Sequence, residues 1–413
     1  MDTGDTAWIL TSSALVLLMT PGLAFFYGGM VRAKSVLNMM MMSFIALAVV
    51  PVLWVLYGYT MAFGPDGSSL LGGFGKAGLD GVDVDSLAGT IPEYVFIGFQ
   101  LMFAIITVAL ISGAIADRAK FSAWTVFVVV WMTVVYFPVA HWVFDFGDTG
   151  GWIATELEAI DFAGGTAVHI NAGAAGLALA LVLGRRIGFR REPMRPHNLP
   201  FVLLGAGLLW FGWFGFNAGS AVGANGLAGL AFVNTVVATG AAILGWLLVE
   251  SVRDKKGTSL GAASGAIAGL VAVTPAAGSI SPLGSIALGV VAGVLCALAV
   301  GLKYKLGYDD SLDVVGVHLV GGIVGTVLIG FLAVGDGLFY GGDLSLLGKQ
   351  ALATFAVLGY SFVLTWVIGT VIHKTMGFRV DEDVELAGID QAEHLESAYD
   401  YTSSGGSPFK TGA

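Results

Sequence analysis

The sequence predicts an all-α polytopic membrane protein with eleven transmembrane helices. Of its 413 residues, 56% are hydrophobic and only 12% are charged, about half the charged fraction that is usual in a globular domain. The apolar residues gather in long runs of the length that a helix needs to cross a bilayer. Glycine occurs 61 times, which suits helices that pack closely through small faces.

The predicted spans follow from windows of about 20 apolar residues. They cover residues 7–30, 36–62, 92–115, 121–143, 163–184, 199–219, 227–250, 260–276, 283–304, 314–335 and 347–373. The stretch before the first span is short and acidic, so it lacks the basic region of a signal peptide. Residues 1–374 are therefore expected to form one transmembrane domain, followed by an acidic cytoplasmic tail at residues 375–413.

The positions of lysine and arginine orient these spans. An odd number of spans puts the two termini on opposite sides, and cytoplasmic loops carry the excess of positive charge. With the N-terminus outside, 17 of the 19 basic residues lie inside, and only Lys76 and Lys349 lie outside. The sequence thus predicts an external N-terminus and a cytoplasmic C-terminus.

Two stretches in spans five and ten share one pattern. In Asp161–Gly176 and in Asp310–Gly325, an aspartate precedes a histidine by eight residues, and glycines follow that histidine at positions +4 and +7. A repeat unit of five spans is odd in number, so its second copy enters from the opposite side and the repeat must be inverted. Spans one to five and six to ten are then the two halves, and span eleven lies outside them.

The histidines of this repeat, His169 and His318, are expected to meet near the midplane, where transporter sites generally lie. Two neutral imidazoles that share a hydrogen bond fix each other's tautomers and can pass a small solute or a proton. Two histidines without a nearby cysteine, glutamate or third histidine make a poor metal site, so neither a metal nor a cofactor is expected. No nucleophile with a paired base lies outside the spans, so the chain is not expected to be an enzyme.

Asp161 opens span five and has two candidate roles. An aspartate is a good N-cap for a helix, and it can also hold a negative charge beneath an external vestibule. Both roles can apply at once. Asp310 and Asp313 are the cytoplasmic counterparts and are expected to cap span ten.

Aromatic residues form a further set. Phe99 and Phe103 lie one turn apart on span three, and Trp213 and Phe216 precede Ser220 near the end of span six. Rings near a span end are typical of an interfacial belt. A cage of rings beside a hydroxyl, however, can hold a small cation without a full countercharge.

A series of motifs runs through the chain from residue 20 to beyond residue 320. They are Pro21–Gly29, Phe99–Ala104, Ala140–Trp142, Asp161–Asn171, Trp213–Ser220, Thr274–Gly278 and Asp309–Asp313 with His318. In this order they resemble the Amt/Mep/Rh ammonium transporter family, and specifically its prokaryotic Amt branch. The resemblance implies a homotrimer of eleven-helix protomers in the cell membrane, each with its own pore for ammonium or methylammonium.

The resemblance also implies roles for the aromatic residues. It assigns Phe99 and Ser220 to an external site that recruits ammonium, with Asp161 as a supporting acid. Phe103 and Phe216 correspond to a gate of stacked rings below that site.

Deeper positions follow in the same way. His169 and His318 correspond to the pore-lining histidines, and Trp213 and Thr274 match further pore-lining positions. The resemblance also implies a PII-class regulatory protein that docks on the cytoplasmic loops and tail, and no nucleic-acid partner.

The chain departs from the family where a tryptophan usually stacks over the recruited cation. Here the sequence is Val143-Phe144-Asp145, and phenylalanine has a weaker cation-binding face than tryptophan. Phe144 could bind substrate with lower affinity, Asp145 could compensate by its charge, or Trp152 could reach in from the loop. His141, in the same motif, is expected at the membrane interface.

The expected mechanism separates ammonium from its proton. An intact cation is costly to move through a dry pore, whereas neutral ammonia costs far less. The histidine pair would guide ammonia and relay the proton, which would make transport electrogenic. The alternative is an ammonium sensor with little flux, which is disfavoured because no output domain is fused to the chain.

Overall fold

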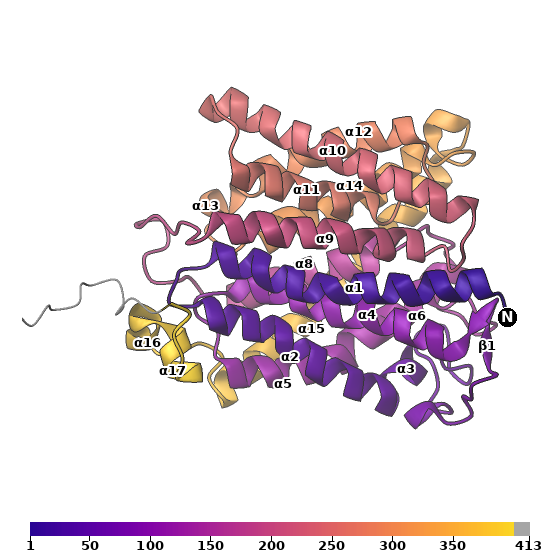
Figure 1. Ribbon diagram of the computed structural model, residues 1–413, viewed down its shortest axis with the longest axis horizontal. Helices are drawn as coiled ribbons and strands as arrows, with labels where there is room; N and C mark the ends of the chain where they lie inside the picture. The colour runs from indigo at the N-terminus through magenta and orange to yellow at the C-terminus, as the bar shows by residue number, and fades with distance from the viewer. Residues whose placement is uncertain (400–413) are drawn as a thin grey trace, which may run out of the picture.

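The chain folds as a bundle of membrane-length helices. The computed structural model describes residues 1–399, and within that part ten helical segments are long and apolar enough to cross a membrane. Figure 1 shows helices running side by side along the long axis of the molecule. They coincide with ten of the predicted spans, as expected for a multi-pass membrane protein.

The predicted eighth span is shorter than expected. The sequence predicts a span over residues 260–276, but α11 (Ser259–Val273) ends after 15 residues. A helix of this length rises about 22 Å, less than the ~30 Å of a bilayer core. Pro275 has no backbone N–H to continue the helical ladder, and the chain goes on in turns such as that from Ala276 N to Val273 O (2.9 Å). The count of eleven full-length spans is therefore not reproduced here.

The first half of the chain contains five membrane-length segments and the loops between them. The segments are α1 (Thr3–Met30); α2 (Val36–Leu53), η1 (Trp54–Gly58) and α3 (Tyr59–Phe63); α4 (Glu93–Ile111) and η3 (Ser112–Ile115); α5 (Phe121–Trp131), η4 (Met132–Tyr136) and α6 (Phe137–Phe144); and η5 (Gly165–Ile170) with α8 (Asn171–Leu183). The loops contain η2 (Ala77–Leu79), the antiparallel strands β1 (Leu87–Ala88) and β2 (Ile91–Pro92), and α7 (Trp152–Thr155).

The second half repeats this plan and adds a long final helix. Its elements are α9 (Leu199–Gly219), α10 (Gly226–Asp254), α11, α12 (Pro282–Ala299) with α13 (Leu302–Leu306), η6 (Val315–Leu319) with α14 (Val320–Leu332), η7 (Leu338–Tyr340) and α15 (Leu344–Thr375), then α16 (Glu382–Ala387) and α17 (Ile389–His394). Both histidine-bearing segments begin with a π-helical turn, η5 and η6.

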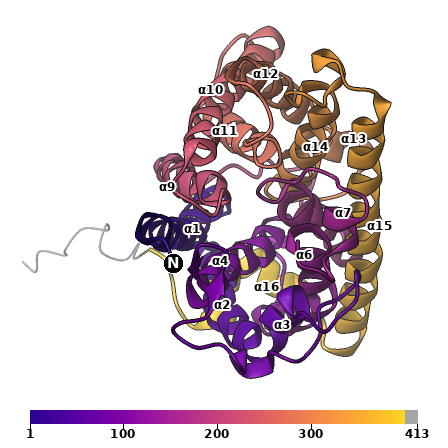
Figure 2. The same cartoon turned by 90° about the vertical axis from the view of Figure 1, so that its right-hand side faces the viewer.

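Figure 2 shows two groups of helices, α1 to α6 and α9 to α14, with α15 running along one side of both. The groups meet where α1 packs along α9, and where the histidine-bearing segments cross, α8 against η6 and α14 against η5. Within the groups, α2 packs against α5 as α10 packs against α12. These are the pairings expected if the two halves are equivalent.

Glycines bring the two histidine-bearing segments into close contact. A Cβ atom added to Gly173 would lie 2.5 Å from the backbone nitrogen of Leu319, and one added to Gly322 would lie 2.9 Å from Cγ1 of Ile170. Each glycine lies four residues after one histidine and contacts the residue that follows the other histidine. Only glycine permits this approach, so the matching glycines of the repeat have a reciprocal packing role.

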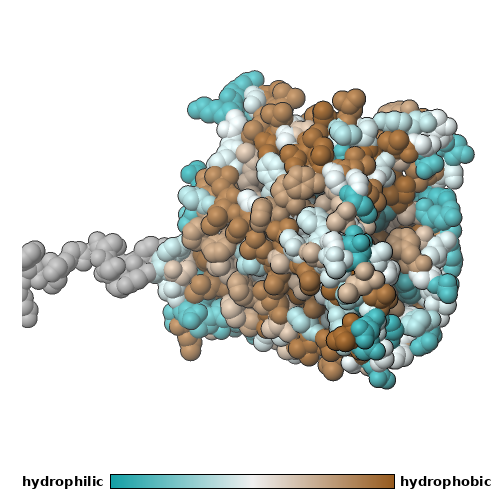
Figure 3. Space-filling view, turned by 45° about the vertical axis from the view of Figure 1, so that its right-hand side comes forward, coloured by the Kyte–Doolittle hydropathy of each residue, from teal (hydrophilic) through white to brown (hydrophobic). Residues whose placement is uncertain are grey.

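The surface is arranged as expected for a protein in a bilayer. Figure 3 shows an apolar band across the middle of one face and hydrophilic residues gathered toward the two ends. On α10, for example, Leu244 is 68% exposed and Val252 is 67% exposed. Exposed aliphatic side chains of this kind are stable against lipid tails or another apolar surface.

The two ends of the bundle carry different parts of the chain. The N-terminal face is defined by the hydrogen bonds from Asp2 N to Thr90 O (2.7 Å) and from Ala224 N to Asp5 Oδ1 (2.8 Å). The tail face, at the opposite end in Figure 1, carries α16 and α17.

The first part of the tail docks onto the helix ends. The carboxylate of Asp390 accepts hydrogen bonds from Leu37 N (3.0 Å) and Asn38 N (2.8 Å) at the start of α2, and Glu385 accepts one from Ile187 N (2.7 Å). The two short helices of the tail are therefore anchored to the ends of the bundle helices. Its final part, residues 400–413 with Ser403–Ser407, lies outside the described residues.

Candidate functional site

The two repeat histidines meet inside the bundle. Nδ1 of His318 lies 3.3 Å from Nδ1 of His169, and the two rings stack with centroids 5.4 Å apart and planes 22° apart. Both residues are buried: His169 is 1% exposed and His318 is 3% exposed. The spacing in the sequence thus correctly predicts that the histidines come together.

This contact fixes the proton arrangement of the pair. A hydrogen bond between two Nδ1 atoms needs one donor and one acceptor, so in the neutral pair one ring is protonated at Nδ1 and the other at Nε2. The two Nε2 atoms therefore have opposite roles, one as donor and one as acceptor. Nε2 of His169 is buried and has no hydrogen-bond partner among residues 1–399, which is costly unless a solute or water pairs with it.

Trp213 and Thr274 complete the surroundings of His169. The indole of Trp213 stacks on His169 at 5.4 Å, and its Nε1 donates to Oγ1 of Thr274 (2.9 Å). That hydroxyl in turn donates to the carbonyl of Leu270 (2.7 Å). The chain of bonds holds the indole face against the imidazole.

A pair of stacked rings separates the histidines from the N-terminal face. Phe103 and Phe216 have centroids 4.2 Å apart and planes 30° apart, and the ring of Phe216 lies 6.0 Å from that of His169. Phe99 packs edge-on against Phe103 at 4.9 Å, as expected for residues one turn apart. The rings form an apolar layer directly above the histidine pair.

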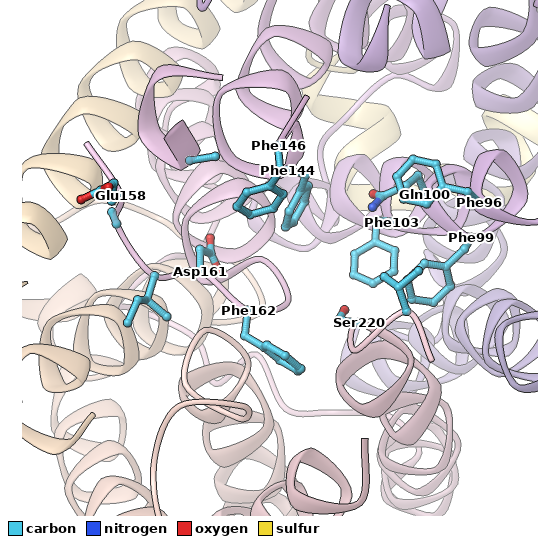
Figure 4. Close-up of a pocket in the computed structure, with 14 residues that line it drawn as sticks. Phe96, Phe99, Gln100, Phe103, Phe144, Phe146, Glu158, Asp161, Phe162 and Ser220 are labelled. Atoms are coloured by element: carbon cyan, nitrogen blue, oxygen red, sulfur yellow. The ribbon is translucent and has the colours of Figure 1, made fainter. Parts of the chain in front are cut away.

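Beyond this layer a cavity of about 420 Å³ opens at the N-terminal face. Figure 4 shows Asp161 and Glu158 on one side of it and Phe99, Phe103 and Ser220 on the other. Phe144 also lines the cavity, with its ring 6.2 Å from that of Phe103. The cavity is thus lined by five residues that the sequence analysis assigned to the recruiting site or the gate: Phe99, Phe103, Phe144, Asp161 and Ser220. The sixth, Phe216, lies deeper, between Phe103 and His169.

The cavity is also lined by residues that the sequence analysis did not assign to it, among them Phe96, Gln100, Glu158 and Phe162. Phe96 and Gln100 share the helix of Phe99, and Phe162 follows Asp161, so helical spacing and adjacency could have indicated these three. Nothing in the local sequence of Glu158 indicates its place.

Ser220 is oriented to accept a hydrogen bond. Its hydroxyl donates to the carbonyl of Phe216 (2.8 Å). The hydroxyl proton is therefore in use, and the remaining oxygen lone pairs are available to a donor such as an N–H group in the cavity.

Asp161 acts as the N-cap of η5. One carboxylate oxygen accepts from Gly164 N (2.8 Å) and Gly165 N (2.6 Å), and the other from Thr166 N (2.8 Å) and Ala167 N (3.3 Å). Burial raises the pKa of Asp161, and these hydrogen bonds act in the opposite direction. The capping role is present, and both oxygens face the backbone rather than the cavity.

The structure distinguishes between the three alternatives for the missing tryptophan. Phe144 lines the cavity, whereas Trp152 packs against Trp142 at 5.8 Å. Asp145 lies 3.2 Å from Nδ1 of His141 and does not line the cavity. Of these three residues, Phe144 is the one that lines the cavity.

His141 lies near the end of α6, next to the loop after α3, and its side chain is enclosed by the protein. The residue is fully buried, and its ring nitrogens bond to two carbonyls, those of Ala62 (2.9 Å) and Ser68 (2.7 Å). Asp145 lies 3.2 Å from Nδ1 of the same ring, and these contacts tie α6 to the loop after α3.

At the tail face, Asp310 caps η6. Its carboxylate accepts from Val314 N (3.1 Å) and Val315 N (2.7 Å). Asp313, the other predicted cap, forms an ion pair with Lys303 (2.7 Å) instead. Beside it, Asp309 binds Arg186 through both oxygens (2.9 and 2.8 Å).

Comparisons with known proteins agree with these observations. A model of the Ammonium Transporter Family matches residues 7–399. An ammonium transporter of Mycobacterium tuberculosis is 61% identical, over 98% of this chain and 92% of the relative. The crystal structure of Candida albicans Mep2 matches with a TM-score of 0.86 and 35% identity, over 93% of this chain and 87% of that chain. A structure described as a sensor Amt protein matches with a TM-score of 0.88 and 28% identity, over 95% and 98% of the two chains. The chain therefore belongs to the ammonium transporter family.

Proposed function

We propose that this protein recruits ammonium in the cavity at the N-terminal face, removes its proton there, and conducts ammonia past the stacked rings and the histidine pair. The observation that carries this proposal is the order of the parts: an aromatic cavity with a serine acceptor, then Phe103 over Phe216, then His169 with an unpaired Nε2. Phe99, Phe144 and Ser220 bind the cation, and Asp161 supports them by fixing the start of η5.

Deprotonation follows from the surroundings of the path. A charged group is costly in the apolar layer of Phe103 and Phe216. Neutral ammonia has a lone pair that can accept a hydrogen bond from one histidine Nε2 and N–H groups that can donate to the other. Trp213 and Thr274 hold His169 in place for this contact. The pair then relays the released proton, so that transport carries current.

We also propose the arrangement in the membrane. The protein has eleven spans with α11 as the short eighth, an inverted five-span repeat, an external N-terminal face and a cytoplasmic tail face. It assembles as a homotrimer in the cell membrane and offers its cytoplasmic loops and tail to a PII-class protein. The reciprocal glycine contacts and the matched helix pairings support the repeat.

The test is to measure current and isotopic uptake from the same purified protein in proteoliposomes, after an ammonium pulse at known membrane potential. Saturable current that tracks uptake is expected. Uptake without current would indicate net ammonia conduction, and neither signal from folded protein would favour the sensor function, which the match to a sensor Amt protein keeps in view. His169→Ala should abolish selective uptake, and unchanged methylammonium uptake and selectivity would contradict the role of the pair.

A further inference from the structure

The rim of the cavity is an irregular segment that other parts of the chain hold in place. This rim segment, residues 156–162, joins α7 to the loop before η5 and contains no helix or strand. It contributes Glu158, Ile160, Asp161 and Phe162 to the cavity lining. Its position therefore determines which groups face a solute in the cavity.

Gln350 on α15 holds the middle of the rim segment. Its Oε1 accepts from Ile160 N (2.7 Å), and its Nε2 donates to Ile160 O (2.7 Å) and to Thr326 O (3.1 Å). The side chain is fully buried. One amide group thus joins the rim to α14, the helix that follows His318.

Lys349, the preceding residue on α15, reaches the charged residue of the rim. Its Nζ lies 2.7 Å from Oε2 of Glu158, whose side chain is 70% exposed. The hydrogen bond and the charge of Lys349 lower the pKa of Glu158, so the carboxylate is ionised at neutral pH. An exposed pair of this kind contributes little to stability, so its main consequence is the charge at the mouth.

The backbone directs Glu158 to this position. Its φ is +54°, a left-handed conformation that is strained for an L-residue. Hydrogen bonds on either side, from Leu157 N to Trp152 O (2.8 Å) and from Ala159 N to Ile153 O (3.1 Å), hold the turn. The strained residue is thus fixed by its neighbours at the edge of the cavity, and Figure 4 shows its carboxylate turned away from the aromatic side of the cavity.

Glu158 and Asp161 are the acids among the described residues that line the cavity. The oxygens of Asp161 are occupied by backbone N–H groups of η5. Glu158 is therefore the acid whose field acts on an incoming cation, and Lys349 offsets that field. Charges at a binding-site rim act on association and depend on salt.

We propose that Glu158 and Lys349 together set the affinity of this mouth for cationic substrate, and that Gln350 is the positioning residue that holds the carboxylate at the rim. The inference rests on the proposed ammonium transport and adds to it. Removing Lys349 leaves an unbalanced negative charge that attracts cations, and removing Glu158 leaves an unbalanced positive charge that repels them.

The experiment measures methylammonium uptake into proteoliposomes for the wild type, Lys349→Met, Glu158→Gln and the double variant, at two salt concentrations. At ~0.02 M salt, KM should fall about threefold for Lys349→Met, rise about threefold for Glu158→Gln and return to the wild-type value in the double variant. At ~0.2 M salt the differences should shrink below about 1.5-fold, because the screening length falls from ~20 Å to ~7 Å. Maximal rates should stay near the wild-type rate.

Matched controls separate charge from structure. Lys349→Arg keeps the charge and should keep the wild-type KM. Lys76→Met makes the same substitution in another ion pair, that of Lys76 with Glu93 (2.5 Å). Neither residue of that pair lines the cavity, so the KM of the Lys76→Met variant should not change. In a Gln350→Leu background the rim segment is released, and Lys349→Met should no longer lower KM.

Two results would overturn the inference. The first is that the wild type transports but Lys349→Met and Glu158→Gln keep the wild-type KM at low salt. The second is that the KM of these variants changes but the change persists at high salt. In either case the pair does not set affinity, although the proposed function stands. If folded wild type does not transport, the proposed function is wrong. In that case the inference is tested by equilibrium binding of methylammonium, in which Lys349→Met should bind more tightly than the wild type and Glu158→Gln more weakly. An equal Kd for all variants would reject the inference.

Discussion

Asp161 and Asp310 occupy equivalent positions, eight residues before the two histidines, yet their surroundings differ. Asp161 accepts hydrogen bonds from four backbone N–H groups and lies beside an open cavity. Asp310 accepts two and lies next to the buried ion pair of Asp309 with Arg186. The comparison teaches that one repeated helix start forms an accessible mouth in one half and a closed, charge-paired end in the other. The same sequence pattern therefore has different surroundings at the two faces of the bundle.

Removing the caps is the strongest test of this comparison. Asp161→Ala leaves four N–H groups without an acceptor and should cost at least about 3 kcal/mol of unfolding free energy, whereas Asp310→Ala should cost about 1.5 kcal/mol. Thermal unfolding in detergent measures both. Asp161→Asn, which keeps one acceptor oxygen, should fall between Asp161→Ala and the wild type. Equal losses for the two alanine variants would show that the caps are equivalent.

The glycine contacts should also differ in strength. Gly173→Ala places Cβ 2.5 Å from the backbone nitrogen of Leu319, whereas the nearest atom to a Cβ at Gly322 is Cγ1 of Ile170 at 2.9 Å, with backbone atoms at 3.1 and 3.2 Å. We expect a cost of about 2 kcal/mol for Gly173→Ala and about 1 kcal/mol for Gly322→Ala.

The same melting assay checks this order. Gly359→Ala on α15, where an added Cβ would meet nothing within 4 Å, serves as the control and should not destabilise the protein. A larger loss for Gly322→Ala than for Gly173→Ala would contradict the packing described for the crossing.

The smallest expected effect is a pH dependence at the closed end. Burial, with Asp313 adding to it and Lys303 opposing it, raises the pKa of Asp310 from 3.8 to about 6. Because the folded state holds this proton more tightly than the unfolded chain, the contribution to stability is full below pH ~4 and is lost as pH rises through about 6.

The wild type should therefore lose about 1 kcal/mol relative to Asp310→Asn between pH 5 and pH 7. Melting of both proteins in detergent across this range gives the difference. A difference that stays constant with pH, or one that grows in the other direction, would mean that Asp310 is ionised throughout.

Most of the fold and much of the site could be predicted from the sequence, for identifiable physical reasons. Span-length apolar runs gave the helices, and the repeated aspartate, histidine and glycines gave the meeting of His169 with His318. The early end of α11 was not predicted, because hydropathy continues past Val273 whereas the helical hydrogen bonds do not.

Other features depend on contacts between residues far apart in the chain. His141 lies near a span end in the sequence, but the loop after α3 folds over it and encloses its ring. Glu158 is a loop acid with no motif, and it pairs with Lys349, 191 residues later in the chain. Such pairings are set by tertiary structure and leave no local signal.

The position of Gln350 also has a consequence for biosynthesis. Ile160 is made when fewer than half of the residues have been added, but the side chain that holds it belongs to α15, the last long helix of the chain. The rim segment therefore has to wait, without its amide partner, until α15 has been synthesised and inserted. A nascent chain that stops before Leu344 would contain both histidines and their glycine crossing but an unfinished mouth. Completion of the last helix is thus the step at which the protein gains its entrance.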